Sequence, residues 1–154
     1  MTTIRPITAN DIPELLALVE QYWLFEDIAG FERASVTGQL QRLCGDPRLG
    51  AGWIAHNGRQ PAGYLLAVYV FSLEHLGLTA EIDEFFVLPS CRGRGVGAQL
   101  LQMAEAEFAR TGCTNVSLQL GRGNEAAHEF YRRNGYADRA GFELLDKDLP
   151  RGEP

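Results

Sequence analysis

The chain has 154 residues, of which 45% are apolar and 22% are charged, and its net charge is −6 at pH 7. This size and composition predict one globular domain over residues 1–154. The negative charge argues against nucleic acid as the main partner and favours a cationic ligand. The three cysteines form no CxxC pair and no pattern with histidine, so we expect neither a disulfide framework nor a metal site. Reduced thiols fit a cytoplasmic protein, and we expect no signal peptide and no membrane span.

Hydrophobic periodicity predicts the elements in chain order. A strand over residues 3–7 is followed by a helix that begins after a capping-box pattern at Thr8–Asp11 and carries its apolar stripe to Trp23. A second helix with a Ser or Thr cap is expected over residues 35–44, and two strands in residues 52–71 flank the hairpin signal Asn57-Gly58. The later elements are a strand at 80–88, a helix after a glycine-rich segment, a strand at 114–120, a helix at 124–135 and a last strand at 141–149. This β-α-α-β-β-β-α-β-α-β order predicts an α/β fold with a mixed sheet.

The segment Arg92–Gly97, "RGRGVG", places three glycines and two arginines at a helix start. Each glycine costs about 0.5–1 kcal/mol relative to alanine in regular structure, so the cluster needs a reason. A helix start offers unpaired N–H groups to an anion, which favours phosphate binding. The Walker A and GxGxxG patterns both fail here. A glycine-rich turn with solvated arginines is the alternative.

Two carboxylates stand inside the expected strand "EIDEFFV". Strand alternation places Ile82, Glu84 and Phe86 on one face and the residues between them on the other. Buried carboxylates are costly unless they are paired or neutralised, so Asp83 and Glu84 are candidates for function. A solvent-exposed strand start that these residues merely decorate explains them equally well.

Two motifs together resemble the GNAT superfamily of acetyl-CoA-dependent N-acetyltransferases. The first is a strand ending in V-x-P and then [RQ]-x-x-G-x-[GA] at a helix start, matched by Val87–Pro89 and Arg92–Gly97. The second, N-x-x-A-x-x-x-Y-x-x-x-G-[FY], is matched by Asn124, Ala127, Tyr131, Gly135 and Tyr136. The order of elements is also that of the superfamily, which implies a mostly antiparallel central sheet flanked by helices. Within the superfamily, the segments "EIDEFFVLPSCRGRGVGAQLL" and "GFELLDKDL" are similar to diamine acetyltransferases of the spermidine/spermine and thialysine type. Cys91 departs from the aromatic residue that is common at its position in these enzymes.

The resemblance implies acetyl-CoA as co-substrate and no metal. Its pyrophosphate would meet the backbone amides of Gly93, Arg94, Gly95, Val96, Gly97 and Ala98, with the side chains of Arg92 and Arg94 adding charge. The backbone of Phe85, Phe86 and Val87 would pair with the pantetheine arm, and Asn124 and Ala127 would lie near the cofactor. Tyr131 matches the general acid of the superfamily, and Asp83 matches its usual glutamate position. Asp83 or Glu84 would take a proton from the amine or hold the cation.

The expected acceptor is the primary amine of a small cationic molecule. Glu26 and Asp27 follow the first helix, in the segment that lines the acceptor site of the diamine enzymes, and together with Asp83 and Glu84 they would bind a second positive charge. Solvated charges at a helix end are the simpler explanation of the first two. A non-catalytic acyl-CoA sensor with this fold and an acetyltransferase for protein tails stay open as alternatives. Relatives often form dimers, so a homodimer is open too, whereas a membrane partner is not expected.

Overall fold

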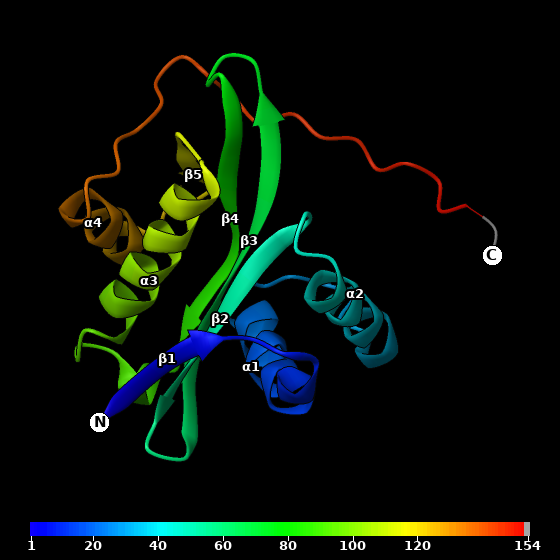
Figure 1. Cartoon of the computed structure of the whole chain (residues 1–154), viewed down its shortest axis with the longest axis vertical. Helices are drawn as coiled ribbons and strands as arrows, with labels where there is room; N and C mark the ends of the chain where they lie inside the picture. Colours follow the sequence, from blue (N-terminus) through cyan, green and yellow to red (C-terminus); the bar gives the residue numbers. More distant parts are fainter. Residues whose placement is uncertain (153–154) are drawn as a thin grey trace. The chain divides into compact units, whose positions relative to one another are not determined.

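In the computed structural model, a five-stranded sheet is built in the order β1-β2-β3-β4-β5 (Figure 1). Neighbouring strands pair antiparallel except β4 and β5, which pair in parallel. The mixed, mostly antiparallel sheet of the prediction is therefore confirmed. The strands are β1 (Thr2–Pro6), β2 (Gly50–Asn57), β3 (Gln60–Ser72), β4 (Gly77–Val87) and β5 (Val116–Leu118).

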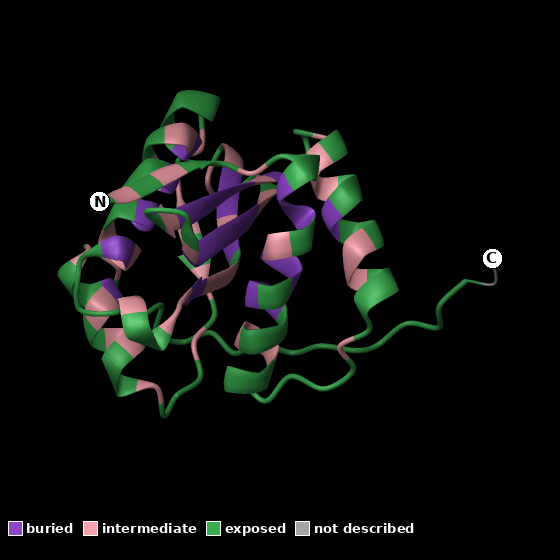
Figure 2. Ribbon diagram, turned by 90° about the horizontal axis from the view of Figure 1, so that it is seen from below, coloured by how far each residue is buried: buried purple, intermediate pink, exposed green. Residues whose placement is uncertain are grey.

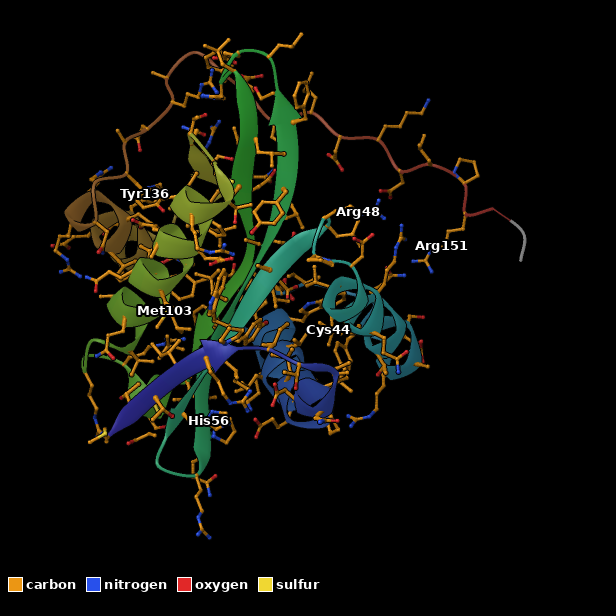
Figure 3. The ribbon with its side chains drawn as sticks, in the orientation of Figure 1. Cys44, Arg48, His56, Met103, Tyr136 and Arg151 are labelled. Carbon is orange, nitrogen blue, oxygen red and sulfur yellow. The ribbon has the colours of Figure 1, made fainter. Side chains whose placement is uncertain are left out.

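Helices cover both faces of this sheet. Helices α1 (Ile12–Phe25) and α2 (Arg33–Gly45) lie on one face, and α3 (Val96–Thr111) lies on the other (Figure 1). Cys44 on α2 and Met103 on α3 mark the two helical layers (Figure 3). Two short 3-10 turns, Ala9–Asp11 before α1 and Pro89–Cys91 before α3, complete this part of the chain.

The structure describes residues 1–152 and divides the chain into one unit over Met1–Gln119 and a second that begins at Leu120. The second unit contains α4 (Glu125–Arg133), and Asn124 caps it because its side-chain oxygen accepts a hydrogen bond from Ala127 N–H at 3.2 Å. None of the helices within residues 1–152 is long and apolar enough to cross a membrane. The single domain stays a prediction.

Apolar stripes of the helices bury themselves against the central strands (Figure 2). On the α1 and α2 side, a core forms around Tyr64 of β3 and Phe86 of β4. On the α3 side, the Phe108 ring lies 5.7 Å from the Trp53 ring, centroid to centroid. The predicted stripe of α1 is confirmed by the burial of Ile12, Leu15, Leu16 and Val19, and α3 buries Leu100, Leu101, Ala104 and Phe108 in the same way.

Two local predictions are wrong. Helix α2 is capped by Glu32, whose carboxylate accepts from the N–H groups of Ala34 and Ser35, and not by a serine or threonine. An acidic side chain suits this place because the helix start carries positive partial charge. The strand expected at 141–149 is an exposed, irregular segment. Within the described residues its unit contains no other strand, and a strand without a partner gains no ladder hydrogen bonds.

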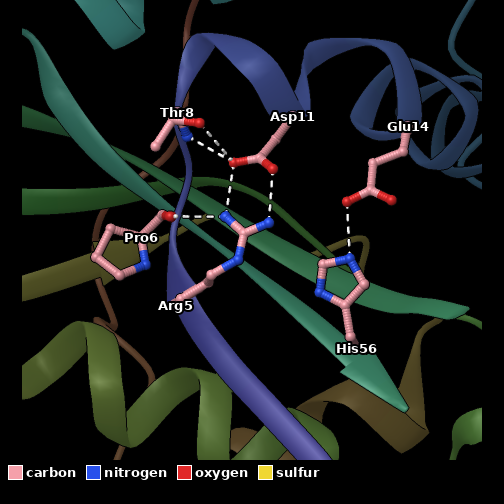
Figure 4. A network of polar contacts seen from close by, with 6 residues as sticks. All are labelled: Arg5, Pro6, Thr8, Asp11, Glu14 and His56. Carbon is pink, nitrogen blue, oxygen red and sulfur yellow. Dashed lines mark hydrogen bonds and ion pairs between the residues drawn. The ribbon is translucent and has the colours of Figure 1, made fainter. Parts of the chain in front are cut away.

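An ion pair fastens β1 to the start of α1 (Figure 4). The two terminal nitrogens of Arg5 donate to the two carboxylate oxygens of Asp11, at 2.8 Å and 2.6 Å. Asp11 also accepts from Thr8 N–H at 2.7 Å, which confirms the predicted capping pattern. The hydrogen bonds from Arg5 hold the pKa of Asp11 well below its usual range, with a smaller contribution from Thr8 and against the opposing effect of burial. A second link, from Glu14 to His56 Nε2 at 2.7 Å, joins α1 to β2.

Replacing Asp11 with asparagine should lower the free energy of unfolding by about 1–2 kcal/mol at pH 7, because a nearly buried charged partner is lost while Arg5 is half exposed. A carboxylate whose pKa is depressed by folding stabilises the fold above its ordinary pKa of about 3.9. That contribution is lost as the pH falls below this value. The difference in the free energy of unfolding between wild type and Asp11→Asn, measured by urea unfolding, should therefore narrow steadily below about pH 4.

The matched control for this prediction is Asp46→Asn, which breaks the exposed pair between Asp46 and Arg48 (Arg48 is labelled in Figure 3). Water screens that pair, so its loss should leave the unfolding curve nearly unchanged. Equal effects of the two variants at pH 7 would contradict the structural role of the Arg5–Asp11 pair.

Candidate active site

A β-bulge in β4 shapes the candidate site. Leu66 of β3 pairs with Glu84, and the next residue, Ala67, pairs with Ile82, so Asp83 is an extra residue in β4. Adjacent residues of β3 face opposite sides of the sheet, and their partners do the same. The predicted alternation is therefore wrong for Ile82, which lies on the opposite face from Glu84 and Phe86.

The Glu84 carboxylate accepts hydrogen bonds from a helix and from the neighbouring strand. The indole N–H of Trp23 on α1 donates to Oε2 at 2.7 Å, and the hydroxyl of Tyr64 on β3 donates to Oε1 at 2.9 Å. Burial raises the pKa of Glu84, although these two hydrogen bonds oppose the shift. Glu84 is thus neither a bare buried charge nor a decoration of an exposed strand, which were the two readings of the sequence.

Asp83 differs from its neighbour, because its side chain is exposed and its carboxylate has no hydrogen bond or ion pair with any residue in 1–152. Partial loss of hydration still raises the pKa of Asp83 above the usual range of aspartate. An accessible carboxylate of raised pKa is a stronger base than an ordinary aspartate.

Tyr22 brings the acidic groups of the site together. Burial raises the pKa of Tyr22 to about 12, with further contributions from the charges of Glu26, Glu84 and Asp83 in that order. The charges of three of the four acidic residues proposed for the acceptor therefore act on one hydroxyl, which stays protonated at neutral pH. Asp27 is not among them; it lies in the turn after α1 with a φ of 54°, in the left-handed region.

The edge of β4 is open beyond the bulge. Strand β5 pairs only with residues Ala80–Ile82 of β4, so within residues 1–152 the ladder between these two strands ends at the bulge. An open edge presents unpaired N–H and C=O groups in the spacing that an extended chain can bind. This is the feature that an amide-containing arm pairing with Phe85, Phe86 and Val87 requires.

The glycine segment forms a turn with unpaired amides at the start of α3. Gly93 and Gly95 have φ values of 74° and 80°, a conformation that favours glycine, and Gly95 is the residue that precedes the helix. The first helical hydrogen bond runs from Gln99 N–H to Gly95 C=O at 3.0 Å. The N–H groups of Val96, Gly97 and Ala98 therefore have no acceptor inside the helix and suit a phosphate.

Arg92 links this turn to two other elements. Its Nε–H donates to the Val87 carbonyl at the end of β4 at 2.9 Å. The guanidinium carbon lies 4.8 Å from the centre of the Phe25 ring on α1 and 5.6 Å from that of Phe86. Arg92 thus contributes more than a solvated charge, whereas Arg94 is simply exposed.

Tyr131 lies on α4 in the second unit. It is buried, and its ring contacts those of Phe130 and Tyr136 at centroid distances of 5.2 Å and 5.4 Å. Its neighbours on the same motif, Asn124 and Ala127, are joined by the capping hydrogen bond described above. The role of Tyr131 as general acid stays a prediction.

Sequence reasoning missed four aromatic residues: Tyr22, Trp23, Phe25 and Tyr64. The indole of Trp23 was expected only as the last residue of an apolar stripe. The two hydrogen bonds to Glu84 join residues 61 and 20 positions apart, so no local spacing could have indicated them. The available signal was that a carboxylate inside a buried strand needs donors, and tyrosine and tryptophan are the apolar residues that carry one.

Comparisons with known proteins show to which family the chain belongs. The family model described as "Acetyltransferase (GNAT) family" matches residues 13–136. An aminoalkylphosphonate N-acetyltransferase of Salmonella typhimurium is 35% identical over 134 residues, which cover 86% of this chain and 83% of that protein. The human spermidine/spermine N(1)-acetyltransferase-like protein 1 is 26% identical over 141 residues, or 88% of this chain and 20% of that protein.

Among solved structures, an integron cassette protein from the Cole Harbour Salt Marsh metagenome has a TM-score of 0.85 and 26% identity, covering 97% of this chain and 91% of that one. The family match spans both units and includes the bulged strand, the glycine turn and α4. The chain belongs to the acetyltransferase (GNAT) family and is an N-acetyltransferase.

Proposed function

We propose that this enzyme, acting as a single domain, transfers an acetyl group from acetyl-CoA to the primary amine of a small acceptor. The observation that carries the proposal is the accessible carboxylate of Asp83, which lies at the bulge where the open edge of β4 begins. The charges of Asp83 and Glu26 both act on Tyr22, and this concentration of negative charge favours a cation. The GNAT family uses acetyl-CoA. The glycine turn suits the pyrophosphate of this co-substrate, and the open edge of β4 suits its amide-containing arm.

Two parts of the chain would hold the co-substrate. The amides of residues 93–98 would bind the pyrophosphate at the helix start, where the unpaired N–H groups and the helix dipole both favour an anion. The backbone of Phe85–Val87 would bind the amide-containing arm along the open edge. Arg92 and Arg94 add positive charge near the turn, and Asn124 and Ala127 come from the second motif.

An ammonium group loses two protons on its way to an amide, one to a base before the attack and one to water as the bond to carbon forms, and the departing sulfur takes up one proton. An alkylamine with a pKa of about 10.4 is mostly protonated at neutral pH, so Asp83 would accept a proton from the ammonium group, directly or through water. Acetyl-CoA, when bound, supplies the acetyl thioester. The amine nitrogen forms its bond to the acetyl carbon as the C–S bond breaks. Tyr131 would then donate its hydroxyl proton to the departing sulfur, as its match to the family motif suggests.

Two observations favour different second groups on the acceptor. The charges of Glu26 and Asp83 both act on Tyr22, which favours a second positive charge, as in a diamine. The Salmonella relative is an aminoalkylphosphonate N-acetyltransferase, and Arg92 would offer a cation to a phosphonate group. The acidic groups outnumber the single arginine at this place, so we propose the dicationic amine and keep the aminoalkylphosphonate as the second candidate.

A panel of matched acceptors should separate these candidates. The three are a diamine, an aminoalkylphosphonate of equal chain length and a monoamine that ends in a methyl group, and turnover is measured as release of the free CoA thiol. We expect the diamine to exceed the monoamine in kcat/KM by about fivefold at low salt. The advantage of the diamine should shrink as the salt concentration rises, because the screening length falls to about 8 Å at physiological ionic strength. Glu26→Gln should also reduce it.

A preference for the aminoalkylphosphonate would overturn the dicationic acceptor in favour of the second candidate. Equal kcat/KM for all three would show that no second charge is recognised. Thiol release with none of these amines, from protein that binds acetyl-CoA, would contradict the small-amine acceptor itself.

Gly95→Asp should weaken acetyl-CoA binding by about 100-fold, because it places a negative charge beside the pyrophosphate. Gly95→Asn is the matched control, since asparagine has the same size and tolerates the same left-handed backbone conformation. Calorimetric titration with acetyl-CoA should show the asparagine variant binding far more tightly than the aspartate variant. Equal affinities of two folded variants would place the pyrophosphate elsewhere.

Tyr131→Phe should lower kcat by about 100-fold and leave the Kd for acetyl-CoA nearly unchanged, since general acid catalysis contributes to the chemical step alone. Phenylalanine keeps the packing of the ring. Tyr136→Phe removes the same hydroxyl from the adjacent ring and should keep kcat within about threefold of wild type. An unchanged kcat in Tyr131→Phe, with chemistry shown to be rate-limiting, would reduce Tyr131 to a packing residue.

A further inference from the structure

We propose that Glu84 is a positioning residue, which through Trp23 fixes the connection between α1 and α2 and so sets the affinity for the acceptor amine. In this assignment Asp83, and not Glu84, is the carboxylate that meets the reacting amine. The inference rests on the acetyl transfer proposed above and assigns different tasks to two adjacent acidic residues. It also adds Trp23, which no motif singles out, to the residues that determine how the acceptor binds.

Both oxygens of Glu84 are already engaged by neutral donors. Oε2 accepts from Trp23 and Oε1 from Tyr64, and the Tyr64 side chain is fully buried. An indole N–H is a donor only, so it has to find an acceptor when it is withdrawn from water. An amine that bound to Glu84 in place of Trp23 would leave this N–H unpaired, at a cost in free energy. The geometry thus assigns Glu84 to the link between α1 and β4.

Trp23 transmits this link to residues 26–32, the connection from α1 to α2. Its ring meets the Phe31 ring edge-on, with 5.6 Å between the centroids. Its backbone carbonyl accepts from Ile28 N–H at 2.8 Å, which closes the turn after α1. Glu26 N–H donates to the Tyr22 carbonyl at 2.9 Å, so the acidic end of the helix is held by the same turn. Movement of the indole would therefore move the residues proposed to face the acceptor.

The Asp83 carboxylate takes no part in these contacts. It is the extra residue of the bulge, its side chain is exposed, and within residues 1–152 no donor engages its carboxylate. An approaching ammonium group can therefore bind Asp83 without breaking a contact of the fold. The two carboxylates are adjacent in sequence, but the bulge directs one to the core between α1 and the sheet and leaves the other at the surface.

Kinetics with the best acceptor of the panel test this assignment. Trp23→Phe should raise the KM for the amine by about 10-fold, the effect of losing one hydrogen bond to a charged group. It should change kcat by less than about threefold and leave the Kd for acetyl-CoA unchanged. Trp53→Phe is the matched control: Trp53 packs against Phe108 on the α3 side, so its loss should leave the KM for the amine at the wild-type value.

Glu84→Gln and Glu84→Leu form the decisive pair. The glutamine amide can accept from Trp23 through its oxygen and donate to the Tyr64 oxygen through its nitrogen, so it keeps both links without the charge. Glu84→Leu should raise the KM for the acceptor. Glu84→Gln should keep this KM close to the wild-type value and leave the pH dependence of kcat/KM unchanged. Asp83→Asn should instead lower kcat/KM by about 100-fold. Circular dichroism checks that each variant is folded.

Tryptophan fluorescence supplies a readout that does not need turnover. The chain has two tryptophans, so the Trp53→Phe background leaves Trp23 as the only emitter. Adding Glu84→Leu should shift its emission, and adding Glu84→Gln should not. A kcat reduced about 100-fold in Glu84→Gln, with unchanged emission and acceptor KM, would overturn the proposal and make Glu84 the base. An emission unaffected by Glu84→Leu would also overturn it. Absence of thiol release from the wild type would defeat the acetyl transfer, while the emission would still decide whether Glu84 holds Trp23.

Discussion

The extra residue at Asp83 is the constraint on which the rest of the site depends. Without it, β4 would keep one alternation from Ile82 to Phe86, and Ile82 and Glu84 would lie on the same face of the sheet. The bulge reverses the alternation between these positions and leaves one carboxylate unpaired at the surface. It lies where β5 stops pairing with β4, so the irregular residue and the open strand edge occupy the same place.

The charges of the site are arranged by desolvation as much as by pairing. Burial raises the pKa of Glu84, and hydrogen bonds from Trp23 and Tyr64 offset part of this shift. Neutral donors hold the carboxylate without cancelling its charge, so the region keeps a negative field. Arg92 is engaged by the Val87 carbonyl and by the rings of Phe25 and Phe86. The glycine turn and the end of α1 are thereby joined through one side chain.

Much of the fold could be predicted because its signals are local. The Thr8–Asp11 capping pattern and the Asn57-Gly58 hairpin each depend on the backbone preference or hydrogen bonds of two residues, and both occur where expected. The prediction of a strand at 141–149 was wrong because an alternating pattern is not sufficient to form a strand. A partner edge is needed as well, and nothing in the spacing of Phe142 and Leu144 reveals whether one is present.

By itself, the sequence determined the family, the order of the helices and strands as far as α4, and the chemistry available, since the motifs from Val87 to Gly97 and from Asn124 to Tyr136 are contiguous patterns. Only the tertiary structure decided which carboxylate is free. Asp83 and Glu84 are adjacent and chemically almost equal, and their difference comes from a one-residue offset against β3 and from donors 61 and 20 residues away. Strand register and long-range hydrogen bonds are set by the packing of the whole sheet, so no local pattern encodes them.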